Sequence, residues 1–347
     1  MRLRGVAGCL AATLCLLLGA CGVPGEPLPP LLEIPAPVHD LAVEQVGAKI
    51  FLRFSVPQLT TEGTRVRYLN RIEIHGAFLP TESSPETFPE QARMLATVPA
   101  GQLPEGQGQI TYELPLEASE RGRKAWLAVK AINHREKDAG FSNISTVEIA
   151  DLPEPPGDLS ATLTEQAIQL RWTPAQQSAF GGPAPTPDGY EVLRSEAGST
   201  APAQLLGTAD SPSYDDRAFS FGARYAYTVR AFARRGDSTA RTAESNRVET
   251  AAEDRFPPAA PQNLRAVAVS GAVELAWSPN AEPDLAGYNI YRSEGGSFAR
   301  LNREMLFLPL FRDSTVQPGT SYRYVVKAVD RAGNEGEASA EAPATGE

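Results

Sequence analysis

Residues that could perform chemistry on a substrate or hold a metal are scarce in this sequence of 347 residues. It contains three histidines and three cysteines. The histidines, His39, His75 and His134, lie far apart along the chain. The sequence lacks the zinc-protease pattern HExxH, the CxxC pair, the phosphate-binding P-loop, GxGxxG after a strand and the serine elbow GxSxG. We therefore expect no catalytic residue, no cofactor and no metal site.

Two carboxylate positions, Asp215-Asp216 and Asp313, have the residue type that general acid–base catalysis uses. They occupy equivalent places in two repeated segments, just before a turn. Because side-chain oxygens of Asp accept backbone N–H groups in turns, capping of the turn explains the repetition better than catalysis does.

The first residues predict a secretion signal. Arg2 and Arg4 precede an apolar stretch at 6–18, which is too short to span a bilayer comfortably. The stretch ends in Leu18-Gly19-Ala20-Cys21, which resembles the lipobox of bacterial lipoproteins. The resemblance implies that residues 1–20 are a lipoprotein signal peptide and that Cys21 carries the lipid. The alternative is an ordinary signal peptide in which Cys21 is incidental.

Cysteine usage and the following segment agree with this interpretation. Cys9 and Cys15 fall in the discarded segment, so Cys21 is the one cysteine of the mature sequence. Residues 21–36 are rich in proline and are predicted to form an extended tether. Gly22 stands where an Asp commonly retains lipoproteins in the inner membrane, so we expect an outer-membrane location if the source is Gram-negative. Periplasmic and surface-exposed orientations both stay open.

The rest of the sequence repeats a unit of about 100 residues. Alternating apolar and polar residues predict a half-buried strand at Ile168–Trp172 and again at Val273–Trp277. Two further pairs of segments match without a gap. They are Tyr190–Ser195 with Tyr288–Ser293, and Gly222–Ala231 with Gly319–Ala328.

By these residues the chain resembles fibronectin type III domains. The resemblance implies an all-β fold of three tandem immunoglobulin-like sandwiches, at 37–151, 152–254 and 255–347, of which the first is diverged. It implies core positions for Trp172 and Trp277. It also implies a tyrosine corner at Tyr225 and Tyr322, in which the hydroxyl bonds to an upstream backbone group.

The first segment departs from this pattern at two positions. Phe54 stands where the other copies have Trp, and Ala125 replaces the corner tyrosine. Trp126 then falls on the outward side of its strand, because side chains alternate with period two. We expect Trp126 to be an exposed aromatic anchor or to cover a contact between domains.

Two loops carry further candidate binding residues. Arg235-Gly236-Asp237-Ser238 is an RGDS tetrapeptide, placed where the integrin-binding fibronectin module carries the same residues. The alternative is that this hairpin needs Gly and Asp only in order to turn. The insertion at 176–187 holds one aromatic residue, Phe180.

The formal net charge of −10 disfavours a nucleic-acid binder, which must neutralise phosphates. We predict a non-enzymatic, lipid-anchored cell-envelope protein that acts as a spacer and as a protein- or polysaccharide-binding module. Its expected partners are the membrane and an unidentified envelope protein or polysaccharide. The alternative is an accessory subunit of an extracytoplasmic carbohydrate-active or proteolytic system. A third hypothesis, an enzyme in the first domain, would need a polar pocket that the sequence does not reveal.

Overall fold

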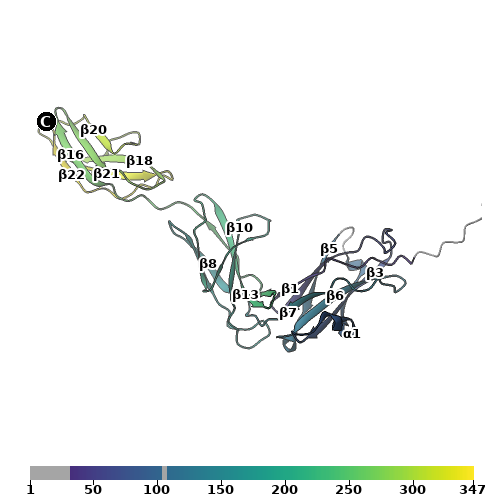
Figure 1. Cartoon of the computed structure of the whole chain (residues 1–347). Helices are drawn as coiled ribbons and strands as arrows, with labels where there is room; N and C mark the ends of the chain where they lie inside the picture. Colours follow the sequence, from purple (N-terminus) through teal and green to yellow (C-terminus); the bar gives the residue numbers. More distant parts are fainter. Residues whose placement is uncertain (1–31, 104–107) are drawn as a thin grey trace, which may run out of the picture. The chain divides into compact units, whose positions relative to one another are not determined.

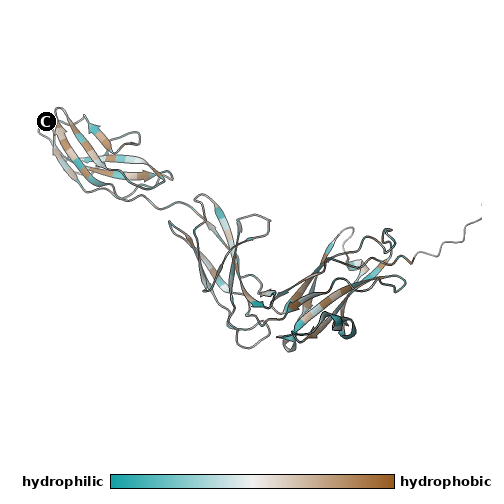
Figure 2. Ribbon diagram, in the orientation of Figure 1, coloured by the Kyte–Doolittle hydropathy of each residue, from teal (hydrophilic) through white to brown (hydrophobic). Residues whose placement is uncertain are grey.

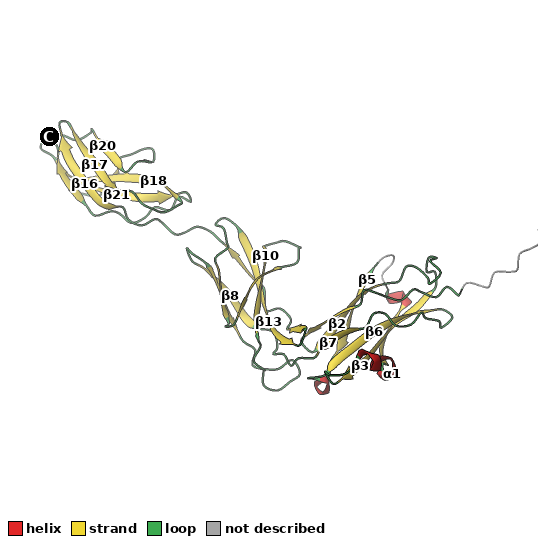
Figure 3. Ribbon diagram, viewed as in Figure 1, coloured by secondary structure: helices red, strands yellow, loops and turns green. Residues whose placement is uncertain are grey.

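The computed structural model describes residues 32–103 and 108–347, and the regular secondary structure of these residues is almost entirely β-strand, joined by loops and turns (Figures 1 and 3). The signal peptide, Cys21 and most of the tether lie outside the described residues. Among the described helices, none has the length and apolar character needed to cross a membrane.

Residues 42–148 form a sandwich of two antiparallel sheets. Three strands pair in the order β1–β2–β5, and four pair in the order β4–β3–β6–β7. The strands are β1 (Ala42–Val46), β2 (Lys49–Ser55), β3 (Leu69–Leu79), β4 (Arg93–Pro99), β5 (Gln109–Pro115), β6 (Lys124–Asn133) and β7 (Ser145–Glu148). Four short helical turns complete it: η1 (Pro85–Thr87), α1 (Phe88–Gln91), η2 (Ala100–Gln102) and η3 (Ala118–Glu120).

The second sandwich has the same plan, with β8–β9–β12 in one sheet and β11–β10–β13–β15 in the other. Its additional strand β14 is the neighbour of β13. The strands are β8 (Gly157–Leu163), β9 (Ile168–Thr173), β10 (Gly189–Glu196), β11 (Gln204–Ala209), β12 (Ser213–Asp216), β13 (Arg224–Arg235), β14 (Ser238–Arg241) and β15 (Val248–Ala251).

The third sandwich repeats the plan once more, as β16–β17–β20 and β19–β18–β21–β22. Its strands are β16 (Gln262–Val269), β17 (Ala272–Ser278), β18 (Leu285–Ser293), β19 (Ala299–Arg300), β20 (Leu310–Asp313), β21 (Ser321–Asp330) and β22 (Ala342–Thr345). The predicted all-β fold of tandem sandwiches is therefore confirmed.

Hydrophobic and hydrophilic residues alternate along many strands (Figure 2). Because successive side chains point to opposite faces of a sheet, the apolar ones share the face that packs in the core. Trp172 packs edge-on against Tyr190, with ring centroids 5.2 Å apart. Trp277 packs in the same way against Tyr288, at 5.1 Å. Both tryptophans are buried, so their predicted core role is confirmed.

The tyrosine corner is also present in both repeats. The backbone N–H of Ser220 donates to the hydroxyl of Tyr225 over 3.0 Å. The N–H of Gln317 donates to the hydroxyl of Tyr322 over 2.9 Å. Each bond holds the loop before the strand against the strand itself, as the resemblance implies.

The prediction that Trp126 is exposed is wrong. Its side chain does lie on the outer face of β6, opposite Ala77 of β3, but it is only 4% exposed. The segment between β3 and β4 folds over that face, and Phe88 of α1 lies fully buried in a small second core with Trp126, Ala77, Leu79 and Ala128. Alternation in the sequence correctly predicted the face on which Trp126 lies, but not that the segment between β3 and β4 buries it.

The contact pattern divides the chain into two compact units, residues 1–150 with Arg235–Ser238, and residues 151–234 with 239–347. The first unit holds the first sandwich, and the second unit holds the other two. The domain boundaries at 151/152 and 254/255 stay predictions in their finer placement.

Because Trp126 is buried, Trp126→Ala is expected to lower the free energy of unfolding of the first sandwich by about 3–5 kcal/mol. Met94, which is 57% exposed on β4 of the same sandwich, is the matched control, and Met94→Ala should change it by about 0.5 kcal/mol or less. Urea unfolding of the two variants measures the difference. Small and equal changes in the free energy of unfolding for the two variants would contradict the burial of Trp126.

Candidate functional site

The carboxylates singled out in the sequence lie at a buried polar group that joins the two sheets of a sandwich. In the third sandwich Asp313 ends β20, and its side chain is 2% exposed. Its Oδ2 accepts hydrogen bonds from the Tyr324 hydroxyl of β21, over 2.9 Å, and from Arg292 Nη1 of β18, over 2.8 Å. Its Oδ1 accepts the backbone N–H of Thr315 over 2.9 Å.

The second sandwich builds the same group. Asp216 Oδ2 accepts from the Tyr227 hydroxyl over 2.7 Å and from Arg194 Nη1 over 2.8 Å. Its Oδ1 caps the turn by accepting the N–H of Ala218 over 2.9 Å. The predicted turn-capping role is thus confirmed for Asp216 and Asp313. Asp215 instead points outward to a partly exposed ion pair with Arg171.

In the third sandwich, burial and hydrogen bonds shift the pKa values of Asp313 and Tyr324 in opposite directions. Burial raises the pKa of Asp313, but the hydrogen bonds it accepts, led by those from Thr315, outweigh burial and leave the pKa below its usual range. Burial and the bond to Asp313 raise the pKa of Tyr324 far above its usual range. Tyr227 is shifted in the same direction by burial and by Asp216. Because the buried carboxylate spends its oxygens on Tyr, Arg and the backbone of the turn, we assign the group a structural role.

The first sandwich replaces this polar group with apolar atoms. The pairing registers put Leu114 where Asp216 and Asp313 stand. They also put Gly76 opposite Leu127, at the place of the Arg–Tyr pairs. A Cβ on Gly76 would come within 2.8 Å of Leu127 Cδ2, so the glycine makes room for the leucine. The second and third sandwiches therefore have all three of Asp, Arg and Tyr at these places, and the first has none of them. An alignment of the three repeats in the sequence shows the same correlation and could have indicated that the three residues interact.

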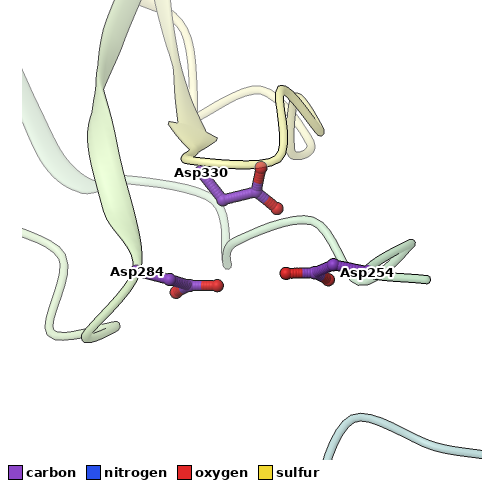
Figure 4. A group of neighbouring side chains, drawn as sticks. All are labelled: Asp254, Asp284 and Asp330. Carbon is purple, nitrogen blue, oxygen red and sulfur yellow. The ribbon is translucent and has the colours of Figure 1, made fainter. Parts of the chain in front are cut away.

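Two aspartates of the third sandwich gather in a separate cluster with Asp254 of the segment before it (Figure 4). Carboxylate oxygens of Asp254, Asp284 and Asp330 lie within 4.8 Å of one another, and Ca²⁺ and Mg²⁺ prefer such all-oxygen sets. Asn334, however, donates to both oxygens of Asp330, from its backbone N and from Nδ2, each over 2.8 Å. Its Nδ2 also donates to the Asp254 carbonyl over 3.1 Å. The cluster thus has a structural explanation, and we assign no ion to it.

The three histidines do not converge. His39 precedes β1, His75 lies on β3 and His134 follows β6. His75 Nε2 lies 3.0 Å from Glu73 Oε2 on the outer face of β3. His134 instead packs edge-on against Tyr68, with ring centroids 5.0 Å apart.

The predicted loop residues are placed but their binding roles stay predictions. Gly236 and Asp237 form the turn between β13 and β14, and Gly236 has a left-handed backbone with φ of 53°. The tetrapeptide 235–238 clusters with the first unit, where Glu148 N donates to Ser238 Oγ over 3.4 Å. Phe180 is half-buried in its loop, and its N–H donates to Ser178 Oγ over 3.1 Å.

No protein-family model matches this chain. Similar proteins include Exoglucanase B of Cellulomonas fimi, 28% identical over 200 residues, and an amylopullulanase of Thermoanaerobacterium saccharolyticum, 38% identical over 89 residues. These matches cover 56% and 25% of this chain but only 17% and 7% of the two enzymes. The chain therefore spans a small part of the length of the relatives it matches.

Among solved structures, an Fn3-like protein from Clostridium thermocellum is 35% identical over 26% of this chain and 96% of its own, with a TM-score of 0.24. The strand order identifies the fold, because a three-stranded sheet and a four-stranded sheet form each sandwich. In the second and third sandwiches a corner tyrosine also accepts a hydrogen bond from the backbone of the loop before its strand. The chain is built of tandem fibronectin type III sandwiches. The Asp, Arg and Tyr side chains in its fibronectin type III cores, which could perform chemistry elsewhere, hold the sheets together here.

The buried group of the third sandwich predicts a specific acid sensitivity. Because the pKa of Asp313 is lower in the folded state than in the unfolded state, its contribution is present above about pH 4 and is lost as the pH falls through the folded-state value. Asp313→Asn should destabilise this sandwich by about 3 kcal/mol at pH 7, and the difference from wild type should shrink toward pH 2.

Urea unfolding at several pH values, read from Trp277 in a chain with Phe at the other two tryptophans, measures this effect. Glu274→Gln is the matched control, because Glu274 pairs with Arg312 at the surface of the same sandwich and should matter by less than about 1 kcal/mol. A pH-independent effect of Asp313→Asn would contradict the assignment of a charged Asp313.

Proposed function

We propose that the chain is a non-enzymatic, lipid-anchored cell-envelope protein whose fibronectin type III sandwiches act as spacer and accessory binding module in a carbohydrate-active system. One observation supports this most. The regions similar to this chain are small parts of enzymes named exoglucanase and amylopullulanase, and the chain itself folds as fibronectin type III sandwiches.

The use of the residues inside the sandwiches supports a non-catalytic role. Trp172 and Trp277 fill cores, Tyr225 and Tyr322 hold the corners, and the buried carboxylates bond to Tyr and Arg across the sheets. Buried polar groups that are fully bonded in this way rigidify a core and specify its packing. Binding would then fall to loops and outer sheet faces.

The lipid anchor rests on the sequence. Cys21 at the end of the apolar stretch would become the first mature residue and carry the lipid, and the proline-rich segment after it would hold the sandwiches off the membrane. Removal of residues 1–20 leaves no other cysteine. We propose an outer-membrane location for a Gram-negative source.

A single experiment compares wild type with Cys21→Ser in cells fed labelled palmitate, and then mixes each purified protein with insoluble cellulose, starch and peptidoglycan. Wild type should carry label and fractionate with membranes, while Cys21→Ser should be unlabelled and soluble because its hydroxyl cannot accept the lipid. Both should sediment with at least one polysaccharide, because binding is assigned to the sandwiches, and neither should release reducing sugar.

The labelling measurement and the polysaccharide measurements test different parts of the proposal. Equal labelling and fractionation of wild type and Cys21→Ser would overturn the anchor. Release of reducing sugar would overturn the non-enzymatic role. Sedimentation no greater than that of an unrelated acidic protein on all three polysaccharides would overturn the carbohydrate-associated role.

A further inference from the structure

The third sandwich exposes apolar side chains at one edge of its three-stranded sheet. Phe307 is 81% exposed, Leu308 63% and Leu310 58%. On the outer face of the same sheet Val267 is 58% exposed, and Ala276 is the register partner of Leu310. Exposed apolar residues that cluster in this way mark interaction sites more often than scattered ones do.

The second sandwich shows that the fold does not require these residues. Trp172 N bonds to the carbonyl of Pro212, and Trp277 N bonds to the carbonyl of Pro309, each over 3.2 Å, so the two prolines are equivalent. The residues equivalent to Phe307, Leu308 and Leu310 are then, in order, Asp210, Ser211 and Ser213.

The outer faces of the two sheets differ in the same sense. Across β8, β9 and β12 the registers give the rows Ser160–Arg171–Ser213 and Thr162–Gln169–Asp215. Across β16, β17 and β20 the equivalent rows are Arg265–Ala276–Leu310 and Val267–Glu274–Arg312. The second sandwich thus has a polar outer face and a polar edge at β12, whereas the third has an apolar edge at the equivalent strand β20.

The apolar side chains flank a strand with free backbone groups. Within the part of the chain that the structure describes, β20 pairs with β17 on one side and ends the sheet on the other. Edge strands are usually protected by charge or proline, because their open N–H and C=O groups can pair with another strand. Here Pro309 precedes β20 and Arg312 lies on it, but Phe307, Leu308 and Leu310 are exposed beside the open backbone groups of residues 310–313.

One cationic side chain, Arg312, lies on β20 itself, although the whole chain is acidic. Arg312 of β20 pairs with Glu274 over 2.8 Å, and both side chains are more than half exposed. A complementary partner would therefore carry an acidic residue next to apolar ones.

We propose that Phe307, Leu308, Leu310 and the free edge of β20 bind an extended segment of a partner polypeptide, which adds to the sheet as a further strand. The segment places an apolar side chain beside Leu310 and, two residues along, an acidic side chain beside Arg312, since residues two apart lie on one face. A lipid surface would cover the apolar residues but leave the backbone groups of β20 without partners. The inference depends on neither the lipid anchor nor polysaccharide binding.

The test uses the full mature chain and a phage library of random ten-residue peptides. The variant Phe307→Asp, Leu308→Ser, Leu310→Ser, which gives the third sandwich the residues of the second, serves for counter-selection. Enriched peptides should combine alternating apolar residues with an acidic residue. Synthetic copies should bind the variant at least about tenfold more weakly than wild type, and N-methylation of alternate backbone amides should abolish binding on one register only.

The substitutions replace exposed side chains, so the urea midpoint of the third sandwich should stay unchanged, which separates lost binding from lost folding. Three results would overturn the proposal: no peptide that distinguishes wild type from the variant, wild-type binding to phosphatidylglycerol vesicles that the variant loses, or a dimer in light scattering that the variant loses. The second would assign the patch to a membrane, and the third to a second copy of the chain.

Discussion

A buried aspartate that bonds across two sheets is the interaction on which the second and third sandwiches depend. Asp216 and Asp313 each end the edge strand of a three-stranded sheet, and each accepts a tyrosine hydroxyl and an arginine from the facing four-stranded sheet. The same side chain caps the turn into the next strand. One residue therefore links the facing sheets, the strand end and the turn, and its loss leaves a buried tyrosine hydroxyl without its acceptor and removes the carboxylate that pairs with the arginine.

The first sandwich shows that the fold tolerates a second solution. Gly76, Leu114 and Leu127 occupy the three places of the polar group and replace it with packing. Exchanges of this kind are often neutral in energy, because a buried ion pair loses in desolvation much of what it gains in attraction. What differs is specificity: the polar group is satisfied only in one arrangement of the sheets, whereas leucines pack in several. The first sandwich instead gains a second core on its outer face, around Trp126 and Phe88.

The sequence allowed accurate prediction wherever alternation and repetition act together. The positions of Trp172, Trp277 and the corner tyrosines follow from a period of two and from an internal copy. Burial of Trp126 could not be predicted in this way, because the segment that covers it, residues 80–92, has no counterpart in the other copies. The recurrence of Arg, Asp and Tyr in two repeats could be seen in the sequence. Strand patterns alone, however, do not show that these three side chains, which are distant in sequence, bond to one another. The apolar edge at Phe307 appeared only once the registers aligned two sandwiches residue by residue.

The sandwiches have separate cores, and we expect the loss of one core to leave the first sandwich folded. Hydrogen–deuterium exchange with mass spectrometry, applied to the full chain with and without Leu275→Ala, tests this most directly, because Leu275 lies in the core of the third sandwich alone. We predict faster exchange in peptides from 262–345, by a factor that corresponds to about 2–5 kcal/mol, and unchanged exchange in peptides from 42–148. An equal loss of protection in both regions would show one cooperative structure and exclude separately stable cores.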